Sequence, residues 1–286
     1  MIIVMNNTFK KILYLFVAFF FLILLGYLLC YYRWYPIWQP VAQRKSYSVQ
    51  QNQDDTLRIV MIGDSWTGLH HKWGHDSLLA IMVQDRVSCP VTMEARGKGG
   101  AKSSEIYEMM FRESGLNPEL CTQPLIETSP DYVIVTAGIN DASANLGTEY
   151  YCINYGLIVS HLLACGIRPV IVEMPDVDIK GLYGDKPLKD KLVDRLRSLM
   201  TGVSLYDVKP YRESLRQYLQ DNHMLDSVVY VDLSHWKPDY ITDGIHLSNS
   251  GYHQLDSCLS VFIVADLEKA VDSNMVKKPV KANAEE

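Results

Sequence analysis

The sequence predicts an α/β domain with a mostly parallel sheet, preceded by one N-terminal transmembrane helix. Short apolar runs alternate with segments whose apolar residues recur every three or four positions. Such alternation of strands and helices builds a parallel sheet with helices on both faces. The first run, residues 57–62, is continuously apolar, as expected of a strand buried on both faces. We therefore expect one domain of ordinary size over residues 57–272.

Residues 1–38 are predicted to be a membrane anchor. Residues 12–32 form an uncharged run of 21 residues, enough for a helix to cross a hydrocarbon core of about 30 Å. A cleaved signal peptide would have a shorter apolar core and a small-x-small site, so we expect the anchor to be retained. Lys10 and Lys11 before the run favour a domain outside the cytoplasm, in the periplasm or at the cell surface. The basic residues beyond the run, which weaken that bias, are Arg33, Arg44 and Lys45.

The remaining elements follow in order. Residues 39–56 are polar and aperiodic, which predicts a linker between anchor and domain. Residues 273–286 are charged and poor in apolar side chains, which predicts a disordered tail. Further strands are expected at residues 91–95, 132–137, 169–173, 203–208 and 228–231. Helices are expected at residues 78–87, 103–111, 150–165, 190–200, 211–220 and 249–270.

Composition excludes some classes of function. The formal net charge is −6 and no long basic stretch is present, which argues against a nucleic-acid partner. The six cysteines form no CxxC pair, which argues against a zinc site of that type. Whether Cys89 and Cys121 pair, as an oxidising compartment would allow, stays open at this point.

A serine follows the first predicted strand directly, in the motif Gly63-Asp64-Ser65. Ligands of parallel α/β sheets bind beyond the carboxyl ends of the strands, so Ser65 is expected at the functional edge. Taken alone, the motif also fits a turn or a helix cap. Trp66, the next residue, is bulky and is expected to shape the substrate entrance.

Asp243 and His246 lie in a loop before the last predicted helix. A spacing of three allows both side chains to lie on one side of a turn, where the carboxylate can fix the imidazole tautomer. His246 would then take a proton from Ser65 and return it to a leaving group. The alternative for this pair is a solvated aspartate beside a packed histidine.

Two further motifs offer hydrogen-bond donors after predicted strands. Asn140 follows the strand at residues 132–137, and its amide can donate to a developing oxyanion. Gly100 ends the glycine-rich segment 97–100, where a bare backbone N–H can do the same. A nucleotide-binding loop is disfavoured because both the GxGxxG spacing and a GK[ST] motif are absent. A turn or a helix cap is the alternative for Asn140.

Together and in this order, the four motifs resemble the SGNH (GDSL-type) hydrolase superfamily, over residues 57–270. The resemblance implies a flavodoxin-like three-layer α/β/α domain that hydrolyses esters or thioesters of lipids and glycans without a metal or cofactor. One departure is Ala95, where the family has an asparagine, and it leaves the choice between Gly99 and Gly100 open. The residues implied are Ser65, Asp243 and His246 for catalysis, with Ser65, Gly100 and Asn140 for the oxyanion hole.

Two features lie outside these motifs. His71 and His75 are four residues apart and could hold a metal on one helix. No HExxH motif completes such a site, so we expect no metal and place the histidines of segment 70–75 at the surface or rim. Asp176 and Asp178 follow the fourth predicted strand at the functional edge. They either contact substrate or are solvated loop charges.

The expected function is that of a membrane-anchored serine esterase. It would remove O-acyl groups, acetyl foremost, from a glycan outside the cytoplasm through an acyl-enzyme on Ser65. One alternative is a lipid esterase of the lysophospholipase or thioesterase type. A second is a glycan O-acetyltransferase that works with a membrane partner delivering acyl groups. A third is a glycan-binding domain without activity.

Overall fold

The computed structural model describes residues 7–34, 39–51, 54–113, 115, 117–183 and 185–272. The chain divides between Gln39 and Pro40 into two compact units. The first unit contains the helix α1, and the second, called the α/β unit below, contains every strand of the sheet.

The first unit has one long apolar helix, α1 (Asn7–Trp34). Its segment Asn7–Leu29 has a mean hydropathy of 2.8 and no buried residues. Among the described residues it is the one helix long and apolar enough to cross a membrane. The helix therefore includes the uncharged run, together with Lys10 and Lys11 before it.

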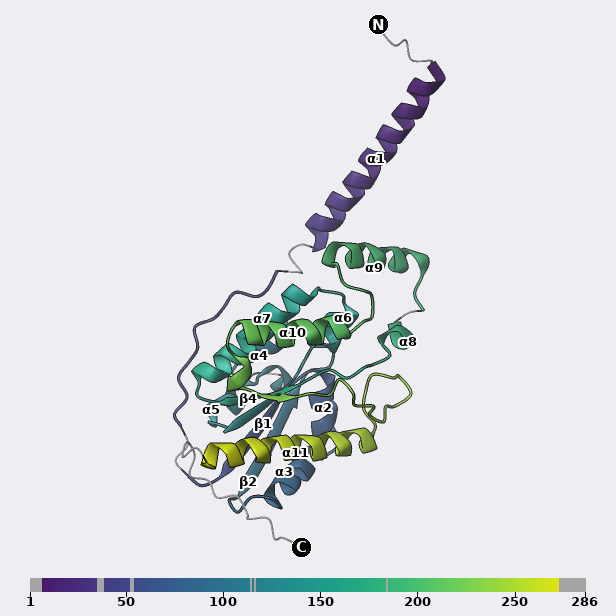
Figure 1. Cartoon of the computed structure of the whole chain (residues 1–286). Helices are drawn as coiled ribbons and strands as arrows, with labels where there is room; N and C mark the ends of the chain where they lie inside the picture. Colours follow the sequence, from purple (N-terminus) through teal and green to yellow (C-terminus); the bar gives the residue numbers. More distant parts are fainter. Residues whose placement is uncertain are drawn as a thin grey trace. The chain divides into compact units, whose positions relative to one another are not determined.

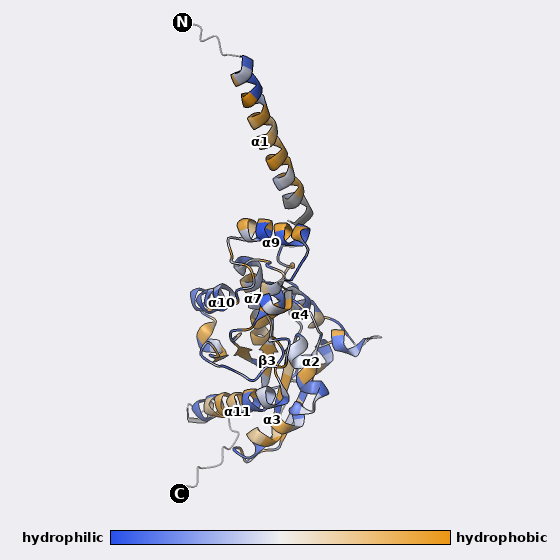
Figure 2. Ribbon diagram, turned by 90° about the vertical axis from the view of Figure 1, so that its right-hand side faces the viewer, coloured by the Kyte–Doolittle hydropathy of each residue, from blue (hydrophilic) through white to orange (hydrophobic). Residues whose placement is uncertain are grey.

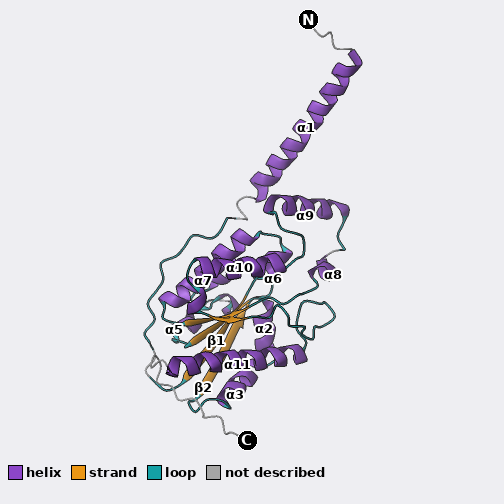
Figure 3. Ribbon diagram, viewed as in Figure 1, coloured by secondary structure: helices purple, strands orange, loops and turns teal. Residues whose placement is uncertain are grey.

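The α/β unit is built on a twisted sheet of five parallel strands (Figure 3). The strands lie in the order β2-β1-β3-β4-β5, so the chain starts at β1 and first turns to one side, then to the other. In parallel sheets, ligands bind beyond the carboxyl ends of the strands at such a reversal, which here lies between β1 and β3. The strands are β1 (Leu57–Gly63), β2 (Val91–Gly97), β3 (Tyr132–Thr136), β4 (Arg168–Val172) and β5 (Val229–Val231).

Helices cover both faces of the sheet (Figure 1). One face carries α2 (Ser65–Lys72), α3 (His75–Gln84) and α11 (Asn249–Asp272). The other carries α4 (Ser103–Met109), α7 (Thr148–Ala164) and α10 (Lys209–Asp221). The unit is therefore the three-layer α/β/α domain that the sequence predicts. The remaining helices are α5 (Gln123–Glu127), α6 (Ile139–Ser143), α8 (Ile179–Tyr183) and α9 (Leu188–Thr201), with short 3-10 turns at Pro118–Leu120 and Leu225–Ser227.

Burial explains why the central strands are apolar throughout. All five residues of β3 are buried, and so are six of the seven residues of β1, because helices pack on both faces. The edge strand β2 instead alternates between exposed and half-buried side chains in its first half. An apolar run is thus the sequence signature of a central parallel strand, and alternation that of an edge.

The prediction of a strand at residues 203–208 is wrong. These residues form a turn between α9 and α10, and Tyr206 has a φ of 61° that no strand allows. Val203 and Val208 are nevertheless buried, at 6% and 4% exposure, because the turn packs against the core. The apolar residues of this run therefore pack as a loop.

The segment after α1 differs from a free tether. Residues 40–51 have no helix or strand, as a linker would, but they pack against the rest of the α/β unit. Val41 N–H donates to Asn154 Oδ1 at 3.0 Å, and Arg44 forms an ion pair with Glu108. Tyr47 packs on Phe111 and His161 and donates its hydroxyl to the Met110 carbonyl. This part of the chain is fixed to the unit.

The cysteines of the α/β unit are all free thiols. Cys89 and Cys121, which the sequence left open as a pair, are both buried and unpaired. Burial raises the pKa of Cys165 to about 11, which keeps that thiol protonated and unreactive. Among the described residues, packing and hydrogen bonds rather than disulfides hold the fold.

Candidate active site

Three of the four motifs lie at the carboxyl edge of the sheet, each directly after a strand. Ser65 is the first residue of α2, and the buried Asp64 carboxylate caps that helix by accepting from Trp66 N–H at 3.0 Å. At Gly63 the strand β1 approaches β3 very closely. A Cβ there would lie 2.2 Å from Thr136 Oγ1 and 2.4 Å from the Thr136 carbonyl oxygen. Glycine therefore lets the strand deliver Ser65 to this edge.

The Ser65 hydroxyl, the His246 imidazole and the Asp243 carboxylate form one chain of hydrogen bonds. Ser65 Oγ lies 2.8 Å from His246 Nε2, and His246 Nδ1 lies 2.6 Å from Asp243 Oδ2. A neutral imidazole protonated on Nδ1 donates to the carboxylate and accepts from the hydroxyl. The side chains of His246 and Asp243 are 24% and 23% exposed, so a substrate can reach them. The structure thus brings Ser65 together with a histidine 181 residues away and with the aspartate that contacts that histidine.

The Asp243 carboxylate is held as a charged acceptor. Its Oδ1 accepts the backbone N–H groups of Ile245 and His246, both at 2.9 Å. Burial opposes its ionisation, yet the hydrogen bonds from His246 and from these two N–H groups bring the pKa of Asp243 below its ordinary value. The carboxylate therefore stays charged through the physiological range and can orient the imidazole.

Trp66 connects α2 to the loop that carries His246. Its indole N–H donates to the Ile245 carbonyl at 3.1 Å, and its own carbonyl accepts from the Tyr252 hydroxyl at 2.9 Å. The side chain is only 3% exposed. The expectation that Trp66 shapes the substrate entrance is therefore wrong, because its ring packs inward. It instead fixes the distance between Ser65 and the histidine.

Besides Ser65, the predicted oxyanion donors are Asn140, in the first turn of α6, and Gly100, in the loop between β2 and α4. Asn140 Nδ2 donates to the Ala101 carbonyl at 3.0 Å and lies 3.5 Å from Asp64 Oδ2. Gly100 has a φ of 76°, which favours glycine, and its N–H has no acceptor among the described residues. The contact with Ala101 places the Asn140 amide next to the residue that follows Gly100. A bound oxyanion would have to replace one of the two acceptors that the amide now has.

Two buried carboxyl groups support these loops and were not assigned from the sequence. Asp141 accepts from the Ser103 N–H at 3.0 Å and from the Ser103 hydroxyl at 2.6 Å, which ties α6 to the start of α4. Burial raises the pKa of Asp141 to about 6 and that of Asp64 to about 7. In the sequence, the signal for these two aspartates is their position next to Ser65 and next to Asn140 in the two motifs. Their hydrogen bonds hold Ser65 and Asn140 in place.

The histidines after Ser65 do not form the arrangement expected from their spacing. His71 and His75 cannot share one helix, because α2 ends at Lys72 and Gly74 turns the chain with a φ of 78°. His71 is 61% exposed and pairs with Asp76. His75 is buried and meets His70 instead, so the prediction of a surface or rim position holds for His71 and is wrong for the other two.

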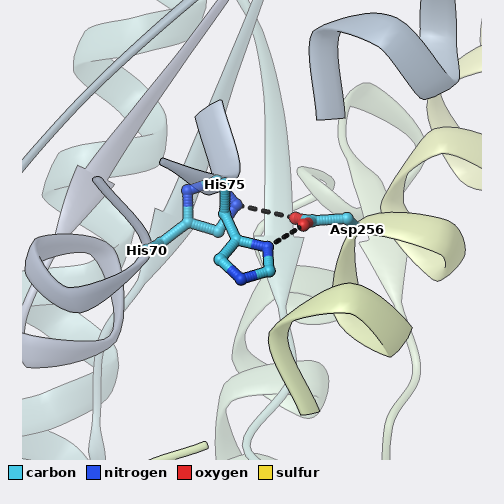
Figure 4. A group of neighbouring side chains, drawn as sticks. All are labelled: His70, His75 and Asp256. Carbon is cyan, nitrogen blue, oxygen red and sulfur yellow. Dashed lines mark hydrogen bonds and ion pairs between the residues drawn. The ribbon is translucent and has the colours of Figure 1, made fainter. Parts of the chain in front are cut away.

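His70 and His75 face the same carboxylate, that of Asp256 on α11 (Figure 4). His70 Nε2 lies 2.7 Å from Asp256 Oδ1, and His75 Nδ1 lies 2.6 Å from Asp256 Oδ2. The far ring nitrogens contact Asp76 at 3.0 Å and Asn249 at 3.0 Å. The three ligand atoms lie within 4.8 Å of one another, close enough for a metal ion. Direct hydrogen bonds account for the same contacts, and they join α2, α3 and α11 behind the active site.

Asp176 and Asp178 are both exposed and hold loops in place. Asp176 forms an ion pair with Arg212 at 2.8 Å, and the Asp178 N–H donates to the Gly244 carbonyl at 3.0 Å. Asp178 Oδ1 also accepts the Gly181 N–H at 2.7 Å. These contacts support the loop of Asp243 from the side.

A cavity of about 670 Å³ opens beside Ser65. Ser65 lies in its wall together with residues of α2, the end of β2 and the turn near residue 118. Its titratable lining residues are His71, Lys72, Glu94, Arg96 and Glu119, and its apolar side chains are Leu69, Ala95 and Pro118. A ligand with both hydroxyl groups and apolar C–H faces suits such a wall.

The chain matches one protein-family model and is similar to several solved structures. The model of the GDSL-like lipase/acylhydrolase family matches residues 61–254. The chain is similar to a lipase/acylhydrolase from Enterococcus faecalis at 18% identity, over 73% of this chain and 96% of that one, with a TM-score of 0.48. It is also similar to a GDSL-like lipase from Bacteroides thetaiotaomicron at 16% identity, over 84% and 98%, with a TM-score of 0.48. A search of the curated proteins finds no match.

The family model covers more than half of the chain, and it includes Ser65, Asn140, Asp243 and His246. The hydrogen-bonded serine, histidine and aspartate give that match a chemical basis. The chain therefore belongs to the GDSL-like lipase/acylhydrolase family and is a hydrolase that acts on esters.

Proposed function

We propose that this protein is a membrane-anchored serine esterase that removes O-acyl groups, acetyl foremost, from a glycan outside the cytoplasm. The observation that carries the proposal is the chain of hydrogen bonds from Ser65 Oγ through His246 to Asp243, at 2.8 and 2.6 Å. A serine hydroxyl is a weak nucleophile, and a hydrogen-bonded neutral imidazole held by a carboxylate is what activates it.

The reaction begins when His246 Nε2 accepts the Ser65 proton and Oγ attacks the acyl carbonyl carbon. The carbonyl oxygen becomes an oxyanion, which the Ser65 and Gly100 N–H groups and the Asn140 amide stabilise. The tetrahedral intermediate collapses, the bond to the alcohol breaks, and His246 gives its proton to that leaving oxygen. A water molecule, deprotonated by His246, then attacks the acyl-enzyme and releases the acid and free Ser65.

The lining of the cavity beside Ser65 supports a sugar ester. Lys72, Arg96 and Glu119 offer charged and hydrogen-bonding groups for hydroxyls or for an acidic sugar. Leu69 and Pro118 offer apolar surface for the C–H face of a ring. A long acyl chain would need an apolar channel. In this cavity it would displace water from the charged side chains, and their loss of hydration would disfavour binding.

The first unit supports a location at a membrane. The α1 segment Asn7–Leu29 is long and apolar enough to span a bilayer, and Lys10 and Lys11 precede its uncharged run. Arg33, Arg44 and Lys45 lie beyond that run and weaken the charge bias. The orientation with the α/β unit outside the cytoplasm rests on the two lysines before the run.

The proposal is tested with the full chain in lipid nanodiscs, next to a Ser65→Ala variant. Both receive p-nitrophenyl acetate, butyrate and decanoate, and then an O-acetylated polysaccharide. We expect release that depends on Ser65, is fastest for acetate, and frees acetate from the polysaccharide. A preference for decanoate would replace the glycan with a lipid substrate. Acetyl transfer between glycans that exceeds hydrolysis would make the protein a transferase.

A further inference from the structure

Helix α9 exposes apolar side chains along one side. Leu188, Leu192 and Leu199 are 74%, 52% and 80% exposed. Spacings of four and seven residues place them within about 40° of one another around a helix of 3.6 residues per turn. Figure 2 shows hydrophobic and hydrophilic residues side by side on this helix, which lies outside the layer of α7 and α10. A surface helix of a soluble domain normally has its apolar side turned inward.

Asp194 is the one buried residue of α9, next to the half-buried Val193, Leu196 and Met200, and polar contacts fix the rotation of the helix. Asp194 is 7% exposed and accepts from Lys186 Nζ at 2.8 Å and from the Tyr206 hydroxyl at 2.7 Å. Ser198 Oγ donates to the Val203 carbonyl at 2.6 Å. A rotation of α9 that buried its leucines would break these hydrogen bonds and separate Asp194 from Lys186 and Tyr206. The outward leucines are therefore a consequence of how the helix is anchored.

Basic residues flank the leucines. Lys189, Lys191 and Arg195 are exposed, whereas the acidic residues of α9 are the buried Asp194 and the half-buried Asp190. An apolar stripe bordered by exposed lysine and arginine is the pattern of a helix that lies in a membrane interface. The basic side chains extend to lipid phosphates while the leucines enter the acyl boundary.

The covalent chain brings α9 within reach of a bilayer. Seven peptide units join Trp34, the end of α1, to Val41, which is fixed to α7 through Asn154. They can span at most about 25 Å. The end of α9 packs on the start of the same helix α7, since a Cβ on Gly147 would lie 3.4 Å from carbons of Thr201. Chain entry and α9 therefore share one side of the α/β unit.

We propose that α9 is an interfacial helix that lies on the anionic surface of the bilayer crossed by α1. The inference rests on the membrane anchor of the proposed function and adds a second contact that sets the orientation of the α/β unit. Leu188, Leu192 and Leu199 enter the headgroup region, and the flanking cations contact lipid phosphates.

The test uses the full chain in nanodiscs of phosphatidylglycerol and phosphatidylcholine with a radiolabelled lipid. A benzophenone amino acid replaces Leu192 in one variant and Ile81 in the other. Ile81, on α3, is a matched control because it is 56% exposed, against 52% for Leu192. After illumination we expect lipid adducts at position 192 at least fivefold above those at position 81. A further variant, Lys191→Gln with Arg195→Gln, should lower the yield at position 192 severalfold.

Equal yields at the two positions would overturn the inference, and so would adducts at 192 to a second protein chain. Alkaline carbonate extraction of native membranes tests the anchor separately. A chain that carbonate releases contradicts the membrane anchor itself. A chain that resists carbonate but gives no lipid adduct at position 192 contradicts only the role of α9.

Discussion

Asn140 has both of its amide hydrogens directed at acceptors within the protein. One bond goes to the Ala101 carbonyl at 3.0 Å, and a longer one goes to Asp64 Oδ2 at 3.5 Å. The longer contact is the weaker of the two, so it is the one an oxyanion would displace. These two hydrogen bonds hold the Asn140 amide in one orientation, so this donor is in place before a substrate binds.

Replacing Asn140 by alanine should lower kcat by about 10²–10³-fold, because one oxyanion donor is lost. The matched control is Ser143→Ala on the same helix, since the Ser143 hydroxyl donates to the Asn140 carbonyl, at 3.1 Å, and not to its amide. Both variants should keep the thermal midpoint within a few degrees. Steady-state kinetics on p-nitrophenyl acetate measures the difference, and equal kcat values for the two variants would remove Asn140 from the oxyanion hole.

Where a motif defines the chemistry, the sequence predicted which side chains lie together, and their catalytic roles stay a prediction. Ser65, Asp243 and His246 were placed by their positions after a strand and before a helix, and the structure brings their side chains together. The inward orientation of Trp66 could not be predicted, because its partner, the Ile245 carbonyl, lies 179 residues away. Contacts of such separation leave no periodic signal.

At the scale of elements, the close approach of β1 and β3 makes Gly63 the most constrained position. A Gly63→Ala change puts a methyl group against Thr136, whose nearest atoms include a backbone oxygen that cannot move aside. We expect a loss of stability of roughly 1–3 kcal/mol or more, as for other overpacked cores. The control is Gly99→Ala, where a Cβ meets open space. Denaturant unfolding in detergent compares them, and equal midpoints would contradict the packing described here.

The long elements were predictable and the short ones were not. The central strands are apolar throughout, and helices such as α7 and α11 extend over many turns, so their patterns are clear. Helices α5, α6 and α8 have five residues each, too few for a helical period to show. The prediction of a strand at residues 203–208 was wrong for another reason. The buried valines of this turn give the same apolar pattern as the buried valines of a strand.

At the scale of the whole molecule, buried charges couple the two sides of the active site. His70 is buried between Asp256 and Asp76, at 2.7 and 3.0 Å. Burial alone would lower the pKa of His70, but the bonds to the two carboxylates raise it above its ordinary value. His70 therefore stabilises the fold in its charged form and holds α2, which begins with Ser65, against α11.

A His70→Gln variant should show a smaller decline of stability with rising pH. Because the folded pKa is raised, the contribution of His70 is complete below about 6.5, the ordinary histidine value. It is lost as the pH rises through the higher folded value. Unfolding free energies of the full chain in detergent, measured from pH 6 to pH 9, should fall more steeply for the wild type. His71→Gln, at a side chain 61% exposed, is the control and should follow the wild type.

The segment after α1 is fixed to the α/β unit, which its composition did not predict. Its polar composition predicted a linker, yet Val41 and Arg44 contact α7 and α4 more than 60 residues away. The composition of a segment can predict that it forms no helix or strand. It cannot predict which groups of a distant helix accept hydrogen bonds from its N–H groups. The chain therefore holds the entry point of the α/β unit more firmly than its sequence indicated.

An acyl-enzyme on Ser65 is the intermediate that distinguishes nucleophilic catalysis by this serine from other routes of hydrolysis. The full chain in detergent is mixed with p-nitrophenyl acetate, quenched in acid within milliseconds, digested and analysed by mass spectrometry. We predict one acetyl group on the peptide that contains Ser65, absent in Ser65→Ala. The account is contradicted if the wild-type chain hydrolyses the ester while no acetyl group appears on Ser65, or if Ser65→Ala keeps wild-type turnover.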